Sequence, residues 1–262
     1  MTIRASLQWE NMTHSGGKAS GNKTSSVRVI RSVLAKYIHP SLMIRALAFY
    51  EKKLFAKGNT ENIVGPVFIL GPPRSGTTLL YETLASHCDF AYMTNLHNRY
   101  SYAPLSITKL IGWRLRRNRT AQYESSYGRI SGLTAPSEAG EFWYRWFPRG
   151  IRIHTGYGQL HSGQISEMRR VIDGMQNMTG RHLLFKNTYN SMRIGALLET
   201  FPNAVFLVSR RNPVDTAQSL LLARRNRLSN KSKWFSVPPR EYEEIVRGTP
   251  EQQVVDQVFC IE

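Results

Sequence analysis

The segment Val67-Phe68-Ile69-Leu70-Gly71-Pro72-Pro73-Arg74-Ser75-Gly76-Thr77-Thr78 decides the fold of this chain. Four consecutive apolar residues, Val67 to Leu70, are typical of a short strand that is buried on both faces. A turn rich in Gly and Pro follows and leads directly into a helical pattern that runs through Ala85. A loop between such a strand and a helix directs backbone N–H groups at an anion, and Gly76 allows a ligand to approach closely. The segment therefore predicts a phosphate-binding loop.

The same order of strand, turn and helix recurs twice further along the chain. Leu183 to Phe185 is a second apolar run, and a helical pattern follows it from about Ser191. Ala204 to Val208 is a third, after which Asn212 and Pro213 suit the N-cap and the first position of another helix. These units predict an α/β domain of the P-loop NTPase-like type, with a central parallel sheet flanked by helices.

The N-terminal part of the chain has a different composition. The stretch from Thr13 to Ser26 contains no apolar residue beyond one alanine, so we expect residues 1–26 to form a disordered tail. From Val27 to Lys57 the apolar residues fall at helical spacing, interrupted at Pro40, which predicts two helices.

The remaining chain, residues 27–262, is expected to form a single domain. Within it, residues 95–181 are predicted to be a mainly helical and loop insertion over the C-terminal edge of the sheet. The last apolar helical pattern stops at Glu262 without a Gly or Pro terminator, and we expect that the C-terminus is incomplete.

The charge of the chain is strongly positive. Its 262 residues include 35 Lys and Arg against 18 Asp and Glu, a formal charge of +17. We therefore expect an anionic partner, which could be a nucleotide, a nucleic acid, a sulfated glycan or a membrane surface. With 41% hydrophobic residues, the composition excludes a wholly disordered chain.

Cysteine content and apolar runs narrow the class further. Cys88 and Cys260 are too few for a disulfide framework and have no CxxC spacing, and no HxxxH or HExxH pair occurs, so no metal site is predicted. No apolar run reaches the ~18 residues of a membrane span, and the polar N-terminus lacks the apolar core of a signal peptide. We expect a soluble, cytoplasmic protein. Peripheral contact with a membrane surface stays an open alternative.

The loop departs from the NTPase pattern GxxxxGK[ST]. Thr77 stands where an NTPase has its phosphate-binding lysine, and the positive charge is at Arg74 instead. The third strand leads into Ser209-Arg210-Arg211, where an ATPase has a magnesium-binding Asp. The alternatives are therefore a P-loop kinase, which these differences disfavour, and a basic nucleic-acid-binding protein, which the charge alone supports.

Together the two motifs resemble those of a known enzyme family. The loop PPRSGTT, and the later Arg211-Asn212-Pro213 with Ser219, are similar to the nucleotide signatures of sulfotransferases that use 3'-phosphoadenosine 5'-phosphosulfate (PAPS). The form with arginine is that of protein-tyrosine sulfotransferases and many bacterial sulfotransferases. The resemblance implies transfer of a sulfuryl group from PAPS to a hydroxyl or amine of a small molecule, glycan or glycolipid. It implies no metal and no nucleic-acid partner.

The resemblance also implies roles for individual residues. The 5'-phosphosulfate would be held by Arg74, Ser75, Gly76, Thr77 and Thr78. The 3'-phosphate would be held by Arg211 and Ser219, which lies about two helical turns after the expected N-cap. Lys186, after the second apolar run, would pair with Arg74 to stabilise charge on the leaving oxygen.

The general base that the acceptor hydroxyl needs is not fixed by the motifs. Cytosolic relatives have a histidine two residues after the lysine, where this chain has Thr188, and tyrosine-type relatives have a glutamate where it has Asn95. The candidates are His97, and Glu138 or Glu141 in a segment that resembles the acidic PxE region of bacterial sulfotransferases. Helix capping is the alternative for these carboxylates.

Two further segments have an open role. Residues 142–147, Phe-Trp-Tyr-Arg-Trp-Phe, suit stacking on a sugar or aryl acceptor, or packing in the core. Residues 114–119, with four arginines, suit an anionic acceptor or lipid headgroups, or a solvated surface.

Overall fold

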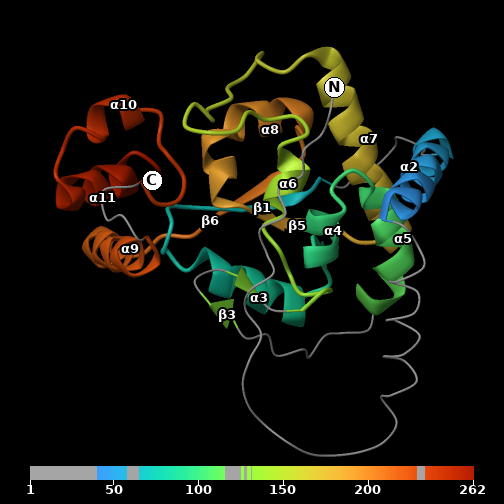
Figure 1. The fold of residues 1–262 in the computed structure, drawn as a ribbon, viewed down its shortest axis with the longest axis horizontal. Helices are drawn as coiled ribbons and strands as arrows, with labels where there is room; N and C mark the ends of the chain where they lie inside the picture. Colours follow the sequence, from blue (N-terminus) through green and yellow to red (C-terminus); the bar gives the residue numbers. More distant parts are fainter. Residues whose placement is uncertain (1–39, 58–64, 116–124, 127–128, 131, 229–233) are drawn as a thin grey trace, which may run out of the picture. The chain divides into compact units, whose positions relative to one another are not determined.

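The computed structural model describes residues 40–57, 65–115, 125–126, 129–130, 132–228 and 234–262 (Figure 1). The chain divides into two units, Met1–Arg45 and Ala46–Glu262, and the second contains the sheet. The predicted disordered tail and the predicted helix before Pro40 lie outside the described residues. The predicted boundary of a single domain at residue 27 stays a prediction.

A four-stranded parallel sheet lies in the second unit (Figure 1). Its strand order is β2-β5-β1-β6, and every neighbouring pair is parallel. The strands are β1 (Val67–Leu70), β2 (Ala91–Tyr92), β5 (Leu183–Lys186) and β6 (Val205–Val208). The predicted α/β class and parallel sheet are confirmed. The additional strand β2 was not predicted because two residues are too few to show a periodic pattern.

Helices follow β1 and β6 directly, as predicted. α3 (Thr77–His87) begins after the Gly-rich loop, and α9 (Pro213–Arg227) begins after Asn212. The Asn212 Oδ1 accepts hydrogen bonds from the N–H groups of Val214 and Asp215 at 2.9 and 3.3 Å, which confirms Asn212 as the N-cap.

After β5 the chain first forms the 3₁₀ helix η1 (Thr188–Met192) and then α8 (Ile194–Thr200). The helix predicted from about Ser191 therefore begins later than expected. The tight turn of η1 positions the residues that directly follow Lys186.

The remaining elements are mostly helices. The described part of residues 95–181 contains helices and loops, and also a short antiparallel pair of two-residue strands that the sequence did not predict. These elements are α4 (Asn95–Arg99), α5 (Pro104–Leu115), β3 (Ser125–Ser126), β4 (Arg129–Ile130), α6 (Gly140–Trp143) and α7 (Ser162–Thr179). The prediction that this segment is an insertion over the sheet edge stays a prediction. Outside this insertion lie α2 (Pro40–Lys57), which begins at the predicted break, α10 (Tyr242–Ile245) and α11 (Pro250–Phe259).

Helices cover both faces of the sheet (Figure 1). Phe68 and Phe185, with ring centroids 5.3 Å apart, join a cluster with residues of α6, α7 and α8. Ile69 and Leu184 join a second cluster with residues of α3 and α5. This alternation follows from the strand geometry, because successive side chains point to opposite faces.

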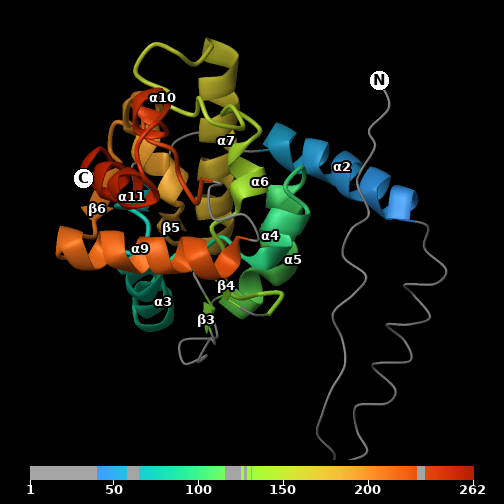
Figure 2. The same cartoon turned by 60° about the vertical axis from the view of Figure 1, so that its left-hand side comes forward.

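The C-terminal helix packs on the helix that follows β6. α11 lies beside α9 in both views (Figure 2), and Val254 and Val258 pack against Ala217 and Leu220. These contacts stabilise α9, which carries Ser219.

Candidate active site

The loop between β1 and α3, residues 71–76, turns at two glycines, and we name it the anion loop. Gly71 has φ 138° and Gly76 has φ 93°, values that residues with a Cβ rarely adopt. A Cβ on Gly71 would lie 2.5 Å from the carbonyl oxygen of Ser209. Glycine is therefore required where the anion loop packs against the chain that leaves β6.

Groups that suit an anion occur in this loop. Gly76 is the N-cap of α3 and has no side chain to accept hydrogen bonds from the first N–H groups of the helix. Ser75 is only 4% exposed, and its Oγ has no hydrogen-bond partner among the described residues. Buried hydroxyls are normally satisfied by a protein group, a water or a ligand, so the Ser75 Oγ is available to a ligand atom. A phosphate or sulfate oxygen would satisfy both features.

Thr77 and Thr78 form the first turn of α3, as the loop motif predicts. Thr77 is buried and Thr78 is half-buried. Their place at the helix N-terminus agrees with a role beside the bound anion, and that role stays a prediction.

The structure brings together the two motifs that the sequence predicted separately. The Arg74 Nε donates a hydrogen bond of 3.1 Å to the Ser219 Oγ. The Ser209 hydroxyl, after β6, donates to the Ser75 carbonyl oxygen at 2.9 Å. The anion loop and the α9 motif therefore form one continuous site.

Arg211 lies at the surface, directly before the N-cap of α9. Its Nη2 is 4.0 Å from the Asp215 carboxylate, and both side chains are about half exposed. An exposed pair at this distance contributes little to stability. The Arg211 guanidinium can therefore leave Asp215 for a ligand at little cost.

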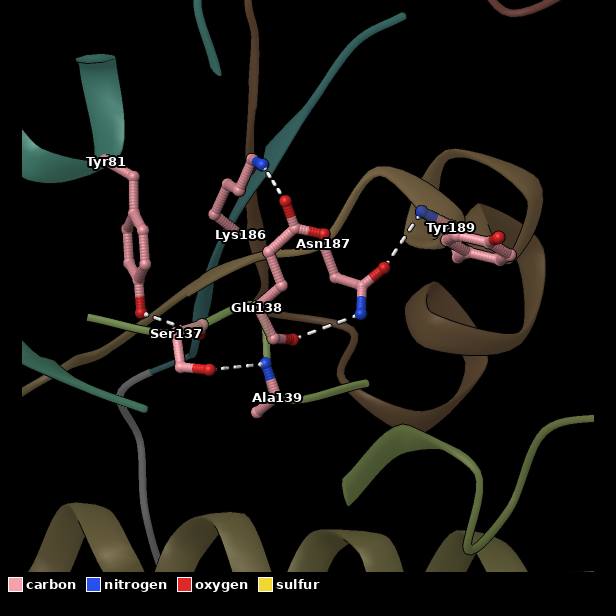
Figure 3. A network of polar contacts seen from close by, with 7 residues as sticks. All are labelled: Tyr81, Ser137, Glu138, Ala139, Lys186, Asn187 and Tyr189. Carbon is pink, nitrogen blue, oxygen red and sulfur yellow. Dashed lines mark hydrogen bonds and ion pairs between the residues drawn. The ribbon is translucent and has the colours of Figure 1, made fainter. Parts of the chain in front are cut away.

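Lys186 and Glu138 form an ion pair at the end of β5 (Figure 3). The Lys186 side chain is only 4% exposed, whereas the Glu138 side chain is 34% exposed. A buried ammonium without a partner is strongly destabilising, so the Glu138 carboxylate supplies the counter-charge that the buried Lys186 side chain needs. Because the Glu138 side chain is partly exposed, it is accessible to a substrate while it pairs with Lys186.

The register of the sheet places this ion pair beside the anion loop. Lys186 lies opposite Ile69, and Ile69 stands two residues before the first residue of the anion loop. Val208 lies opposite Leu70, the residue directly before the loop. The Gly71 N–H also donates to the Ser191 Oγ of η1 at 3.2 Å. Lys186, the anion loop and η1 lie at or directly after the C-terminal ends of β5 and β1, the edge at which ligands bind in open α/β sheets.

Tyr81 of α3 connects the anion-loop helix to the chain that carries Glu138. Its hydroxyl is close to two carbonyl oxygens, those of Met93 at 3.3 Å and Ser137 at 3.4 Å. Burial raises the pKa of Tyr81 well above its ordinary value, so the hydroxyl stays protonated and donates. The sequence analysis did not identify this residue, because a tyrosine in a helix is more often a core residue.

His97, the first candidate base, is completely buried at the start of α4. Its Nδ1 accepts a hydrogen bond from the Thr94 N–H at 3.1 Å, and its Nε2 lies 3.0 Å from the Thr108 Oγ1. Burial lowers the pKa of His97 to about 3, so the ring is neutral. Both nitrogens are engaged within the fold, which favours a capping role for His97 over the predicted catalytic one.

Glu141, the third candidate, forms an exposed ion pair with Arg149. Its two carboxylate oxygens accept from the Arg149 guanidinium at 3.2 and 2.6 Å. The structure therefore places Glu138, and not Glu141, against Lys186.

A buried arginine directly after η1 was also missed. Arg193 is fully buried, and its guanidinium lies over the Phe147 ring at 4.5 Å and near the rings of Tyr144 and Tyr189. Burial lowers its pKa to about 10. No sequence signal marks this residue, because two of the three aromatic side chains around it, Tyr144 and Phe147, come from a segment more than 40 residues away.

The two segments with an open role have different outcomes. Four of the aromatic side chains in residues 142–147 are buried in the core: Phe142, Trp143, Trp146 and Phe147. Core packing is therefore the main role of that segment. The side chains of the basic run at residues 114–119 all lie outside the part that the structure describes.

The described part of the chain lacks two features that would change its class. Among these residues, no group of three or more His, Cys, Asp and Glu side chains could hold a metal ion. No described helix combines the length and the hydrophobicity that a bilayer crossing requires.

Comparison with known proteins identifies the family. A sequence model of the sulfotransferase family matches residues 66–249, so the chain belongs to the sulfotransferase family. No curated protein matches the chain significantly. A similar solved structure is that of the sulfotransferase STF9 from Mycobacterium avium, with 17% identity and a TM-score of 0.41. The match covers 70% of this chain and 51% of that one, so the chain spans about half the length of that protein.

Proposed function

We propose that this chain is a PAPS-dependent sulfotransferase that transfers a sulfuryl group to a hydroxyl or amine of a small-molecule, glycan or glycolipid acceptor. The observation that carries the proposal is the ion pair of Lys186 and Glu138 at the sheet edge where the anion loop begins. Membership of the sulfotransferase family favours sulfuryl transfer over the kinase and nucleic-acid alternatives.

The donor would be held at both of its phosphate groups. The anion loop offers the Ser75 Oγ, the uncapped N-terminus of α3 and the Arg74 guanidinium to the 5'-phosphosulfate. Arg211 and Ser219 on the α9 side would hold the 3'-phosphate, because the bond from Arg74 to Ser219 shows that the two parts lie within reach of each other. Charge-assisted hydrogen bonds from arginine make such contacts selective for phosphate.

The chemistry requires one proton transfer and one bond exchange. Glu138, whose side chain is partly exposed, would accept the proton of the acceptor hydroxyl. The acceptor oxygen then forms a bond to sulfur while the bond between sulfur and the phosphate oxygen breaks, and 3'-phosphoadenosine 5'-phosphate leaves. Lys186 and Arg74 would stabilise the negative charge that develops on the leaving oxygen. No metal ion has a role in this scheme.

Location in the cytoplasm belongs to the same proposal. The absence of a spanning helix among the described residues is compatible with it.

A transfer assay tests the proposed function. Purified protein is incubated with radiolabelled PAPS and a panel of phenols, alkyl alcohols, amines, sugars and glycolipids, in excess chelator. We expect label to appear in at least one acceptor without added magnesium. A protein that transfers phosphate from ATP only when magnesium is added would overturn the proposal in favour of a kinase.

A further inference from the structure

The chain adopts a strained conformation directly after Glu138. Ala139 has φ 47° and ψ 50°, which is the left-handed region that residues with a Cβ avoid. Strain of this kind persists only where surrounding contacts hold it, and it occurs most often at functional sites. We name residues 136–139 the Glu138 turn, and ask which contacts hold it.

One side of the Glu138 turn is held by its own neighbours and by α3. The Ser137 N–H donates to the Met93 carbonyl at 2.8 Å, and the Ser137 Oγ accepts from the Ala139 N–H at 3.3 Å. The Tyr81 hydroxyl donates to the Ser137 carbonyl oxygen from the α3 side. These bonds fix Ser137, but none of them comes from the strand that carries Lys186.

Asn187 holds the turn from the opposite side, directly after Lys186 (Figure 3). Its Nδ2 donates to the Glu138 carbonyl oxygen at 3.0 Å, and its Oδ1 accepts from the Tyr189 N–H at 2.9 Å. The side chain is 3% exposed, so water does not compete for these bonds. A carboxamide offers a donor and an acceptor at once, which an ionised carboxylate of the same shape does not.

We infer that Asn187 is a positioning residue that fixes the Glu138 carboxylate at the distance from Lys186 that transfer requires. The inference rests on the proposed function, because it assigns the position of the proposed base. Asn187 directly follows Lys186 in the chain, and its side chain forms a hydrogen bond with the main chain of Glu138. It therefore links the backbones of the two members of the ion pair. We name the two hydrogen bonds of the Asn187 side chain the clamp. The clamp also holds the strained Ala139, since the Glu138 carbonyl that it binds belongs to the same peptide unit as the Ala139 nitrogen.

Two substitutions of Asn187 test the clamp, and a third substitution, at Ala139, tests the strain that the clamp holds. Asn187→Asp keeps an acceptor for the Tyr189 N–H but places a carboxylate oxygen against the Glu138 carbonyl oxygen. Asn187→Ala removes both bonds. Ala139→Gly removes the strain, because glycine adopts the left-handed region readily, and it therefore reduces the need for the clamp.

Gln176→Ala is the matched control for lost stability. Gln176 is a buried amide at the other end of the same strand, where its Oε1 accepts from the Leu183 N–H at 3.3 Å. The control removes a comparable contact without touching Glu138.

The experiment measures turnover of PAPS with water as the acceptor probe, together with hydrogen–deuterium exchange of peptides that cover residues 134–142. For Asn187→Asp we expect kcat to fall by about 10- to 100-fold, as for a misplaced catalytic group, with KM for PAPS unchanged and faster exchange in the Glu138 turn. Asn187→Ala should behave similarly, and adding Ala139→Gly should restore part of its kcat. Gln176→Ala should lower the melting temperature and leave kcat unchanged.

Three results would overturn the inference. The first is an Asn187→Asp variant with wild-type kcat. The second is a loss of kcat that Gln176→Ala reproduces at equal loss of melting temperature, which would make Asn187 merely structural. The third is a wild-type protein that turns over no PAPS, either with water or with any acceptor of the transfer-assay panel, which sinks the proposed function and the positioning role with it, whatever the exchange data show.

Discussion

The anion loop and the Glu138 turn both contribute a charged side chain to one edge of the sheet, yet they are built in different ways. The anion loop is one contiguous segment, shaped by Gly71 and Gly76 between a strand and a helix. The Glu138 turn is held by contacts from three distant segments, through Tyr81, Met93 and Asn187. Each contains one strained residue with a Cβ, Arg74 with φ 73° and Ala139 with φ 47°.

The difference separates two kinds of site. A contiguous loop depends on local backbone chemistry, so single substitutions in it should affect binding and catalysis with little effect on the fold. An assembled turn depends on tertiary contacts, so its function should be sensitive to residues that never touch the substrate. The predictions below test this difference in order of expected effect.

The largest effect is expected at the assembled turn. Glu138→Gln removes the proposed base, and transfer from PAPS should fall by about 10²- to 10⁴-fold. The matched control is Glu141→Gln, three residues away in an exposed ion pair, which should keep wild-type activity. Both variants should still bind 3'-phosphoadenosine 5'-phosphate, as measured by calorimetry. Equal losses in the two variants, or none at Glu138, would remove Glu138 from its proposed role.

The second effect tests the contiguous loop. Arg74→Ala removes the charge that is proposed to stabilise the leaving oxygen, and the transfer rate should fall by about 10²- to 10³-fold without loss of the folded state by circular dichroism. Arg225→Ala removes an exposed arginine of α9 that pairs with Glu251, and it should not change the rate. An Arg74→Ala variant that transfers sulfate at the wild-type rate would contradict the role of the loop.

The third effect concerns stability and tests whether His97 is structural. Its pKa is about 3 in the folded protein against an ordinary value of 6.5, so the unfolded chain binds the extra proton first as the pH falls. The contribution of His97 to stability is therefore present above about pH 6.5 and is lost toward pH 3. The lost stability amounts to about 1.4 kcal/mol per pH unit from this residue.

Urea unfolding at pH 7, 6 and 5 measures this slope. In His97→Gln the side chain does not titrate, so the dependence of the unfolding free energy on pH should be shallower than in the wild type. Identical slopes in the two proteins would show that His97 does not titrate with folding, and would reopen its candidacy as a base.

The contiguous features were predictable from the sequence, and the assembled ones were not. Three features depend only on residues that are neighbours in the sequence: the apolar run at residues 67–70, the glycines of the anion loop and the Asn212 cap. The structure confirms all three. The choice among His97, Glu138 and Glu141 was open, because burial and pairing with Lys186 depend on how distant segments meet. Asn187 directly follows Lys186 in the sequence, but an asparagine after a strand is common. Its role becomes visible only when the structure shows the Glu138 carbonyl oxygen that it binds.

The central claim is that the site binds a nucleotide with a 3'-phosphate, and isothermal titration calorimetry tests it most directly. The protein is titrated in excess chelator with 3'-phosphoadenosine 5'-phosphate and, in parallel, with adenosine 5'-phosphate. Hydrogen bonds to charged groups contribute about 1.5 to 3 kcal/mol each, so the 3'-phosphorylated nucleotide should bind at least about tenfold more tightly. Arg211→Ala should reduce that ratio. Equal affinities for the two nucleotides in the wild-type protein would contradict the account.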